Sequence, residues 1–223
     1  MDIASGLIEK IALYAIPTIF AITLHEAAHG YVAKHFGDYT AYQQGRISLN
    51  PLVHIDPIGT IVMPIVLVLV TAGQFVFGWA KPVPVNFSNL RNPKRDMLWV
   101  AAAGPGANLC MALLWGLVFR LSLLLPTNYF SYPLHRMAIG GVEINLVLLF
   151  LNLIPIPPLD GGRIAVSLLP NRLAYRFAMI EPYGFIIIIA LLATRVLAVI
   201  IGPLVTLGST LIYALFGLSL NVP

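Results

Sequence analysis

The chain alternates apolar runs with short polar connectors, and most runs approach the roughly 20 residues that a helix needs to cross a bilayer. We expect five of these runs to be full membrane-spanning helices. The remaining run, residues 58–72, is only about 15 residues long, which favours a segment that enters the membrane and returns on the same side. The expected spans are residues 7–34, 97–125, 139–153, 183–201 and 203–217.

The composition agrees with a membrane protein. Of the 223 residues, 59% are hydrophobic and 10% are charged, and the mean hydropathy is +0.88, whereas soluble domains carry about 25% charged residues. The net charge of +4 is spread over short connectors, without a basic cluster of the kind that binds nucleic acid. No connector is long enough for a soluble domain. The sequence therefore predicts an all-α polytopic protein that forms a single domain, residues 1–223, in a lipid bilayer.

The candidate chemistry lies in the first apolar run, in the pattern His25-Glu26-Ala27-Ala28-His29. Histidines four residues apart lie on one helix face, about one turn from each other, so both imidazoles can bind one Zn²⁺. Glu26 lies beside the first histidine and is free to take a proton from water that the metal activates. Polar groups inside an apolar segment are costly unless a function compensates them, so we interpret the pattern as a catalytic zinc site.

A catalytic zinc site usually has a third protein ligand, and the candidates are Asp38, Asp56 and Asp160. Asp160 follows a stretch of prolines and precedes Gly161 and Gly162, which together break a helix and turn the chain. Such a break within a membrane is tolerated where it is packed in protein or lines a wet cavity. For Asp56, in a polar connector, a turn role is expected instead. We therefore expect Asp160 to complete a site for one zinc ion per chain.

Topology supports Asp160 as the third ligand. If residues 58–72 crossed the membrane, the first helix and the helix before Asp160 would end on opposite sides, and their side chains could hardly meet. If the segment re-enters, both ends lie on one side, and the excess of Lys and Arg there predicts that this side is cytoplasmic. We expect a multi-pass protein of the cell membrane with its active site toward the cytoplasm. The basic residues on that side are Lys34, Arg46, Lys81, Arg91, Lys94, Arg95, Arg163, Arg172 and Arg176.

Two further stretches leave alternatives open. The run Lys81-Pro82-Val83-Pro84-Val85 cannot lie in a helix interior. It is either an extended strand that pairs with an unwound substrate or a loop that proline keeps rigid. His54 lies in a polar connector, where it has either a regulatory role near the zinc or substrate, or a structural role.

Three motifs together carry a family resemblance: His25-Glu26-Ala-Ala-His29, Gly104-x-x-x-Asn108 and Asn152-x-x-Pro-x-Pro-Pro-Leu-Asp160-Gly-Gly. They resemble the site-2 protease family of intramembrane zinc metalloproteases, and in particular its compact group without PDZ or CBS domains. The resemblance implies a three-helix catalytic core within residues 7–165, with zinc bound by the two histidines and Asp160 and with Glu26 as general base. Residues 183–217 would then form two accessory transmembrane helices.

Members of this family cut transmembrane segments of other membrane proteins, including anti-sigma factors, and remnants of signal peptides. The resemblance therefore implies regulated intramembrane proteolysis of a transmembrane protein substrate. It also suggests that Asn108 and Asn152 line the catalytic or substrate cleft. Either amide could donate a hydrogen bond to the oxyanion of the reaction, or could instead make an interhelical hydrogen bond.

Two other functions are open from the residues alone. In a metal-ion transporter or channel, the histidines and the aspartate would mark an ion path. A catalytically silent membrane scaffold would use the same helices for binding only. The transporter or channel has no need for a glutamate beside the first histidine, so Glu26 favours the protease over it. The sequence leaves a homodimer and the identity of the substrate open.

Overall fold

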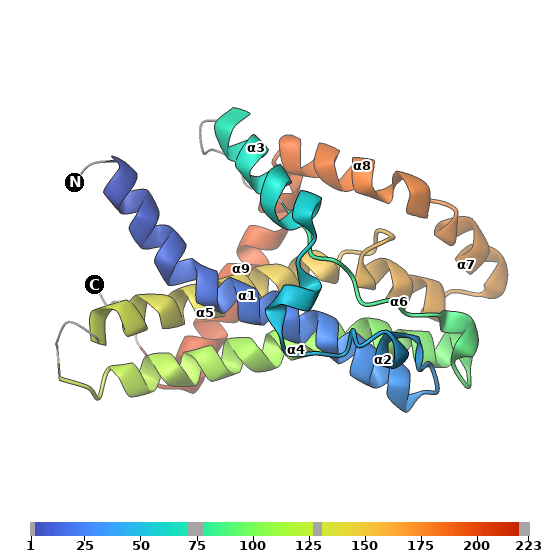
Figure 1. Ribbon diagram of the computed structural model, residues 1–223, viewed down its shortest axis with the longest axis horizontal. Coiled ribbons are helices and arrows are strands. Elements are labelled where there is room, and N and C mark those ends of the chain that lie inside the picture. The colour runs from blue at the N-terminus through green and yellow to red at the C-terminus, as the bar shows by residue number, and fades with distance from the viewer. Residues whose placement is uncertain (1–2, 71–77, 127–130, 219–223) are drawn as a thin grey trace.

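The computed structural model describes residues 3–70, 78–126 and 131–218, with side chains from Leu13 onward. The described chain is helical and contains no β-strand, which confirms the predicted all-α class (Figure 1). In chain order, the helices are α1 (Ile3–His35), α2 (Thr40–Gln43), η1 (Pro51–His54), η2 (Pro57–Val62), α3 (Met63–Val70), η3 (Phe87–Asn89), α4 (Pro93–Ser122), α5 (Ser131–Asn152), α6 (Asp160–Leu168), α7 (Asn171–Ala178), α8 (Glu181–Ala193) and α9 (Val196–Leu215).

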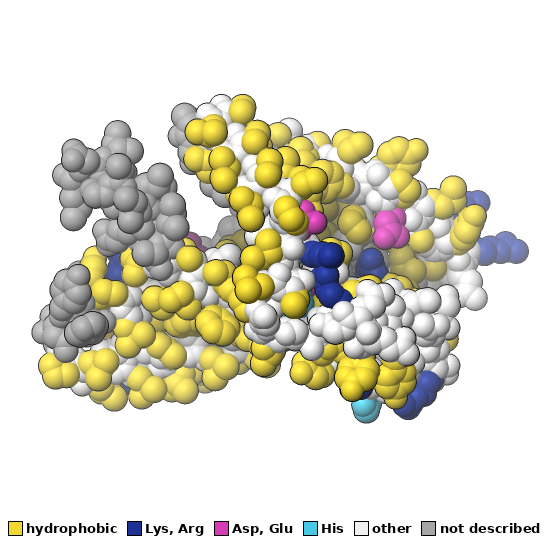
Figure 2. Space-filling model, in the orientation of Figure 1, with side chains coloured by type: hydrophobic (Ala, Val, Ile, Leu, Met, Phe, Trp, Pro, Cys, Tyr) yellow, Lys and Arg dark blue, Asp and Glu magenta, His cyan; other side chains and the backbone are white. Residues whose placement is uncertain are grey.

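Among the described residues, three helices are long and apolar enough to cross a membrane: α4, α5 and α9. Helices α7 and α8 meet at 62° and would count together as a fourth, broken span. Large apolar side chains are exposed on the outer faces of the helices, as expected for surfaces that face lipid (Figure 2). The chain is therefore a polytopic membrane protein. The count of five full spans stays a prediction.

The architecture is centred on a bundle of α1, α4 and α5, which contact one another in every pair (Figure 1). Helix α1 is continuous over 33 residues, contains Pro17, and includes the whole of the predicted first helix, residues 7–34. A buried apolar cluster that includes Ala112 of α4, Leu146 of α5 and Ile212 of α9 attaches α9 to the outside of the bundle. The bundle has the arrangement expected of a three-helix core.

The short apolar run forms a helical segment, η2 followed by α3, that covers Pro57–Val70. The Asp56 carboxylate caps its start by accepting the backbone N–H of Gly59 at 2.7 Å. Residues 71–77 lie outside the described chain, but the Trp79 N–H donates to the Gly59 carbonyl at 3.1 Å. The chain thus comes back to the level at which the segment begins, which is the return that a re-entrant segment requires.

The break between α5 and α6 positions the end of α6 that carries Asp160. The loop 153–159, with its three prolines, turns the chain from the end of α5 to the start of α6. The loop packs closely on the first turn of α6, because a Cβ on Gly161 would lie 2.3 Å from the Leu153 carbonyl oxygen. Since α6 also packs against α4, Asp160 is directed toward the bundle.

Candidate metal centre

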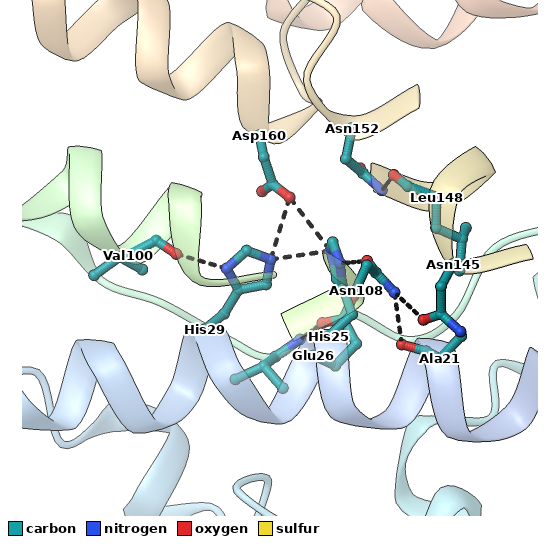
Figure 3. A network of polar contacts seen from close by, with 11 residues as sticks. Ala21, His25, Glu26, His29, Val100, Asn108, Asn145, Leu148, Asn152 and Asp160 are labelled. Carbon is teal, nitrogen blue, oxygen red and sulfur yellow. Dashed lines mark hydrogen bonds and ion pairs between the residues drawn. The ribbon is translucent and has the colours of Figure 1, made fainter. Parts of the chain in front are cut away.

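Three buried side chains from two helices converge at the centre of the bundle (Figure 3). His25 and His29 are one turn apart on α1, and their Nε2 atoms lie 3.1 Å from each other. The Oδ2 atom of Asp160, at the first position of α6, lies 3.3 Å from both nitrogens. These residues are the group in the described chain that could hold a metal ion.

The neighbours of the two imidazoles determine which ring nitrogen carries the proton. The Nδ1 atom of His25 lies 2.6 Å from Oδ1 of Asn108, and Nδ1 of His29 lies 2.7 Å from the Val100 carbonyl. Both partners are hydrogen-bond acceptors, so each Nδ1 is the protonated donor. The Nε2 lone pairs are therefore left to face Asp160, which is the tautomer that binds a metal through Nε2.

Asn108 belongs to a hydrogen-bond network that joins all three helices of the bundle. Its side-chain nitrogen donates to the Ala21 carbonyl of α1 at 3.3 Å and to Oδ1 of Asn145 at 3.0 Å. Asn145 in turn donates to the Gly141 carbonyl of its own helix at 2.8 Å. Asn108 is completely buried, and this geometry favours the interhelical hydrogen bond over contact with an oxyanion.

Gly104 allows the histidine pair to lie against α4. A Cβ at this position would lie 2.4 Å from Nε2 of His29 and 2.6 Å from Nε2 of His25. Such a contact is well inside van der Waals distance, so a side chain at position 104 would displace both rings. The motif Gly104-x-x-x-Asn108 therefore supports the histidines twice, first by close approach and then, one helical turn later, by a hydrogen bond to His25.

The three converging atoms fit a zinc ion. A tetrahedral zinc ion with bonds of about 2.0–2.2 Å holds its ligand atoms roughly 3.3–3.6 Å apart, and the three distances here are 3.1, 3.3 and 3.3 Å. The Oδ2 atom of Asp160 is buried and accepts no hydrogen bond within the described residues. Because three lone pairs face one another, a cation between them would compensate both their repulsion and the burial of the carboxylate.

Glu26 lies beside the cluster without being part of it. Its Oε2 atom accepts the backbone N–H of Val83 at 2.8 Å, which fastens the extended chain after α3 to α1. The carboxylate also lines the cavity that contains the three converging side chains. The glutamate is thus held in the same cavity as the atoms that could hold a metal ion.

Two cavities meet at this site. One, of about 350 Å³, lies between α1, α6 and the extended residues 82–85. The other, of about 520 Å³, is more apolar and lies between α1, α5 and the segment η2–α3. Both cavities are lined by His25, Glu26, Asn152 and Leu159, so Asn152 lies where the two cavities adjoin. Its side-chain nitrogen donates to the Leu148 carbonyl at 3.0 Å.

The other candidate residues lie away from the three converging side chains. Asp56 caps η2, as a turn role predicts. His54 is buried, and its Nε2–H donates to the Ser48 carbonyl at 2.9 Å. It does not belong to the metal-binding group of the described chain, and its regulatory role stays a prediction.

Asp38, the remaining candidate ligand, anchors a loop instead. Its carboxylate accepts hydrogen bonds from the hydroxyl and the backbone N–H of Thr40, from the backbone N–H of Asn86 at 2.7 Å, and from the side-chain N–H of Asn89 at 3.2 Å. Burial by itself raises the pKa of Asp38, but these hydrogen bonds outweigh burial and hold the pKa below its ordinary value of 3.8. Asp38 therefore ties the end of the extended residues to the end of α1.

Comparison with curated proteins finds relatives over most of the chain. It is 39% identical over 206 residues to a Bacillus subtilis protein named "Putative zinc metalloprotease YwhC", a match that covers 90% of this chain and 89% of the relative. It is 32% identical over 184 residues to the Mycolicibacterium smegmatis protein "Putative zinc metalloprotease Rip2", with 80% of this chain and 66% of the relative covered. The Mycobacterium tuberculosis protein of the same name is 31% identical over 147 residues, about half of its length. No family model and no solved structure matches the chain.

Proposed function

Because the chain belongs to the site-2 protease family of zinc metalloproteases, we propose that it is an intramembrane protease. In this proposal it hydrolyses peptide bonds within or next to the transmembrane segments of other membrane proteins. Anti-sigma factors and signal-peptide remnants are the substrate classes that the family suggests.

One observation carries the proposal: two imidazole nitrogens and one carboxylate oxygen, from parts of the chain far apart in sequence, lie 3.1–3.3 Å from one another beside Glu26. We propose that His25, His29 and Asp160 bind the zinc ion. A zinc ion bound there supplies Lewis-acid chemistry, because it acidifies water and polarises a carbonyl group. The donor set of two imidazoles and a carboxylate leaves a fourth position open, as in catalytic zinc sites.

The roles of the surrounding residues follow from their positions. Glu26 accepts the proton of the attacking water and delivers it to the leaving amine, while the N–H of Val83 keeps the carboxylate oriented. Asn152 borders both cavities, so its amide is the candidate donor to the oxygen that gains negative charge in the reaction. Asn108 acts as a positioning residue through His25.

The substrate has to be unwound before it can be cut, because helical peptide groups are enclosed in their own hydrogen bonds. Residues 82–85 are extended and wall one of the cavities, so a substrate strand could lie along them. Their capacity for pairing is limited, because Pro82 and Pro84 have no N–H and Arg46 donates to the carbonyl groups of Lys81 and Pro82. These contacts are compatible with a few hydrogen bonds between the substrate and residues 82–85. They are equally compatible with a loop that forms only a rigid wall of the cavity.

The distribution of charge supports a cytoplasmic orientation of the site. On the face shown in Figure 2, Lys and Arg side chains gather toward the end of the molecule where α6 and α7 lie. Cytoplasmic ends of membrane proteins carry an excess of these residues. We propose that the end of the core from which α6 and α7 extend faces the cytoplasm.

The decisive variant is Glu26→Gln. The intact protein and the variant are co-expressed with single-span reporter proteins, and the fragments and the bound zinc are measured. We expect cleavage by the intact protein only, with a loss of at least about 100-fold in the variant. Zinc stays at one per chain in both, because Glu26 is not a ligand and glutamine can still accept the Val83 N–H.

Two outcomes would contradict the proposal. Unchanged cleavage by Glu26→Gln would remove the assigned base. Zinc flux into liposomes by a protein that cleaves none of the reporters would favour the metal-ion transporter.

A further inference from the structure

Arg163 is the lysine or arginine side chain that lines the same cavity as Glu26 and Asp160. It lies on α6, three residues after Asp160, and so on nearly the same face of the helix. The other ionisable groups of this cavity are the two histidines and two carboxylates. Arg163 is therefore the side chain of this cavity that stays positively charged at neutral pH.

The guanidinium group is held in place but its hydrogen-bonding capacity is hardly used. Its Cζ atom lies 4.9 Å from the ring centre of Phe87, which also lines the cavity. Its Nη2 atom lies 3.7 Å from Oε1 of Glu181, which is beyond hydrogen-bond distance. The described residues supply it with this loose ion pair and this ring contact. Within the described residues, the N–H groups of this guanidinium are therefore left to make the bidentate hydrogen bonds with which arginine binds a carboxylate.

The position of Arg163 relative to the reacting centre can be estimated along the cavity wall. Glu26 contacts this wall at Val83, and Arg163 contacts it at Phe87. Four residues of extended chain span at most roughly 13 Å. An extended substrate beside the wall would therefore bring to Arg163 a group roughly two to four residues from the bond that is cut.

We propose that Arg163 is a specificity-determining residue that binds a carboxylate of the substrate two to four residues from the scissile bond. The inference rests on the proposed proteolytic function. The carboxylate belongs either to an Asp or Glu side chain or to a free C-terminus close to the cleaved bond. On binding, it replaces the loose contact with Glu181 by charge-assisted hydrogen bonds, which are stronger in a partly desolvated cavity than in water.

The test uses a single-span reporter that the intact protein cleaves. In this reporter, one Asp, Asn or Lys is placed in turn at each of the five positions before and the five positions after the scissile bond. A second set of short synthetic substrates ends two to four residues after that bond, with either a free carboxylate or a carboxamide. The full-length protein is compared with Arg163→Gln, Arg163→Glu and the matched control Arg172→Gln, which removes an exposed charge outside the cavity. Glu181→Gln removes the resident carboxylate.

We expect the intact protein and Arg172→Gln to prefer Asp over Asn, or carboxylate over carboxamide, by about tenfold in kcat/KM at one or two positions. Arg163→Gln should lose this preference, and Arg163→Glu should prefer Lys there. Glu181→Gln should keep or strengthen the preference for Asp. Whether the side-chain set or the chain-end set responds identifies the source of the carboxylate.

The results separate this inference from the function on which it rests. If Arg163 only supports the fold, Arg163→Gln will slow the cleavage of all substrates by one common factor, and the inference is overturned. A preference for Asp that survives in Arg163→Gln, or no preference in the intact protein, also overturns it. If the proteolytic function is wrong, the intact protein will cleave none of the reporters and will not differ from Glu26→Gln.

Discussion

Each imidazole at the centre of the bundle is held at the ring nitrogen that faces away from Asp160. The two acceptors, Asn108 and the Val100 carbonyl, both belong to α4, although both histidines belong to α1. The tautomer of both proposed metal ligands is therefore set by a neighbouring helix. Residues that hold a ligand in this way commonly influence metal affinity by about 10-fold to 100-fold.

Replacing Asn108 tests this dependence. Asn108→Leu removes the acceptor for Nδ1 of His25, so we expect zinc affinity to fall about 10-fold to 100-fold. Asn145→Leu is the matched control, because it removes the interhelical partner of Asn108 but leaves the acceptor for Nδ1 of His25, and it should retain most of the affinity. Competition with a chromophoric chelator measures both. Equal zinc affinity in Asn108→Leu and the intact protein would refute the positioning role.

At the scale of elements, the site depends on how closely α4 approaches α1. Gly104→Ala adds a methyl group 2.4 Å from Nε2 of His29 and 2.6 Å from Nε2 of His25. Gly106→Ala is the matched control, because no heavy atom lies within 4 Å of the added Cβ. Both changes raise helix propensity by a similar amount, about 0.5–1 kcal/mol.

We therefore expect Gly104→Ala to lose zinc and cleavage while Gly106→Ala keeps both. Zinc per chain and reporter cleavage are measured on protein purified in the same detergent, and circular dichroism checks that both variants remain helical. A Gly104→Ala protein that binds zinc as the intact protein does would show that α1 and α4 are not held as closely as described.

The hydrogen bonds that Asp38 accepts connect the end of α1 to the end of the extended residues 82–85, and they give a second prediction about how these elements are held together. Asp38→Ala leaves the N–H groups of Thr40 and Asn86 without their acceptor, which should cost about 1–3 kcal/mol of stability. The pKa of Asp38 is lower in the folded protein than its ordinary value of 3.8. The stability that the ionised carboxylate contributes to the folded protein is therefore fully present above pH 3.8. The contribution is lost as the pH falls through the lowered pKa.

The measurement is the difference in thermal unfolding temperature between metal-free intact protein and metal-free Asp38→Ala, from pH 7 down to about pH 3. Removing the metal prevents the titration of zinc ligands from dominating the result. We expect the difference to be largest near neutral pH and to shrink below about pH 4. A difference that grows toward acidic pH would mean that the carboxylate does not stabilise the loop.

For the whole molecule, the sequence predicts contacts between residues that are close together on one helix better than contacts between residues far apart in the chain. His25, Glu26 and His29 were predictable as a group because one helical turn brings them together. Asp160 could be chosen over other aspartates through the helix break before it and an argument about chain topology, because it lies more than 130 residues from both histidines in the sequence. Asn145 was not predicted, because an asparagine in an apolar run carries no sign of which helix supplies its partner.

The orientation in the membrane gives a prediction for the molecule as a whole. A cysteine in place of the exposed Arg172, in a Cys110→Ala background, should react with a membrane-impermeant maleimide only when the cytoplasmic side is accessible. Intact cells and inverted vesicles are compared, with labelling detected by gel shift. Labelling in intact cells would place this end of the core outside the cytoplasm.

X-ray absorption at the zinc edge on the purified protein tests most directly whether His25, His29 and Asp160 together bind one zinc ion. We expect one zinc per chain, with two imidazole nitrogens at about 2.0–2.1 Å and oxygen ligands at about 2.0–2.2 Å, and with loss of one imidazole in His29→Ala. A spectrum with a single imidazole or none, or one that His29→Ala and Asp160→Ala leave unchanged, would contradict it.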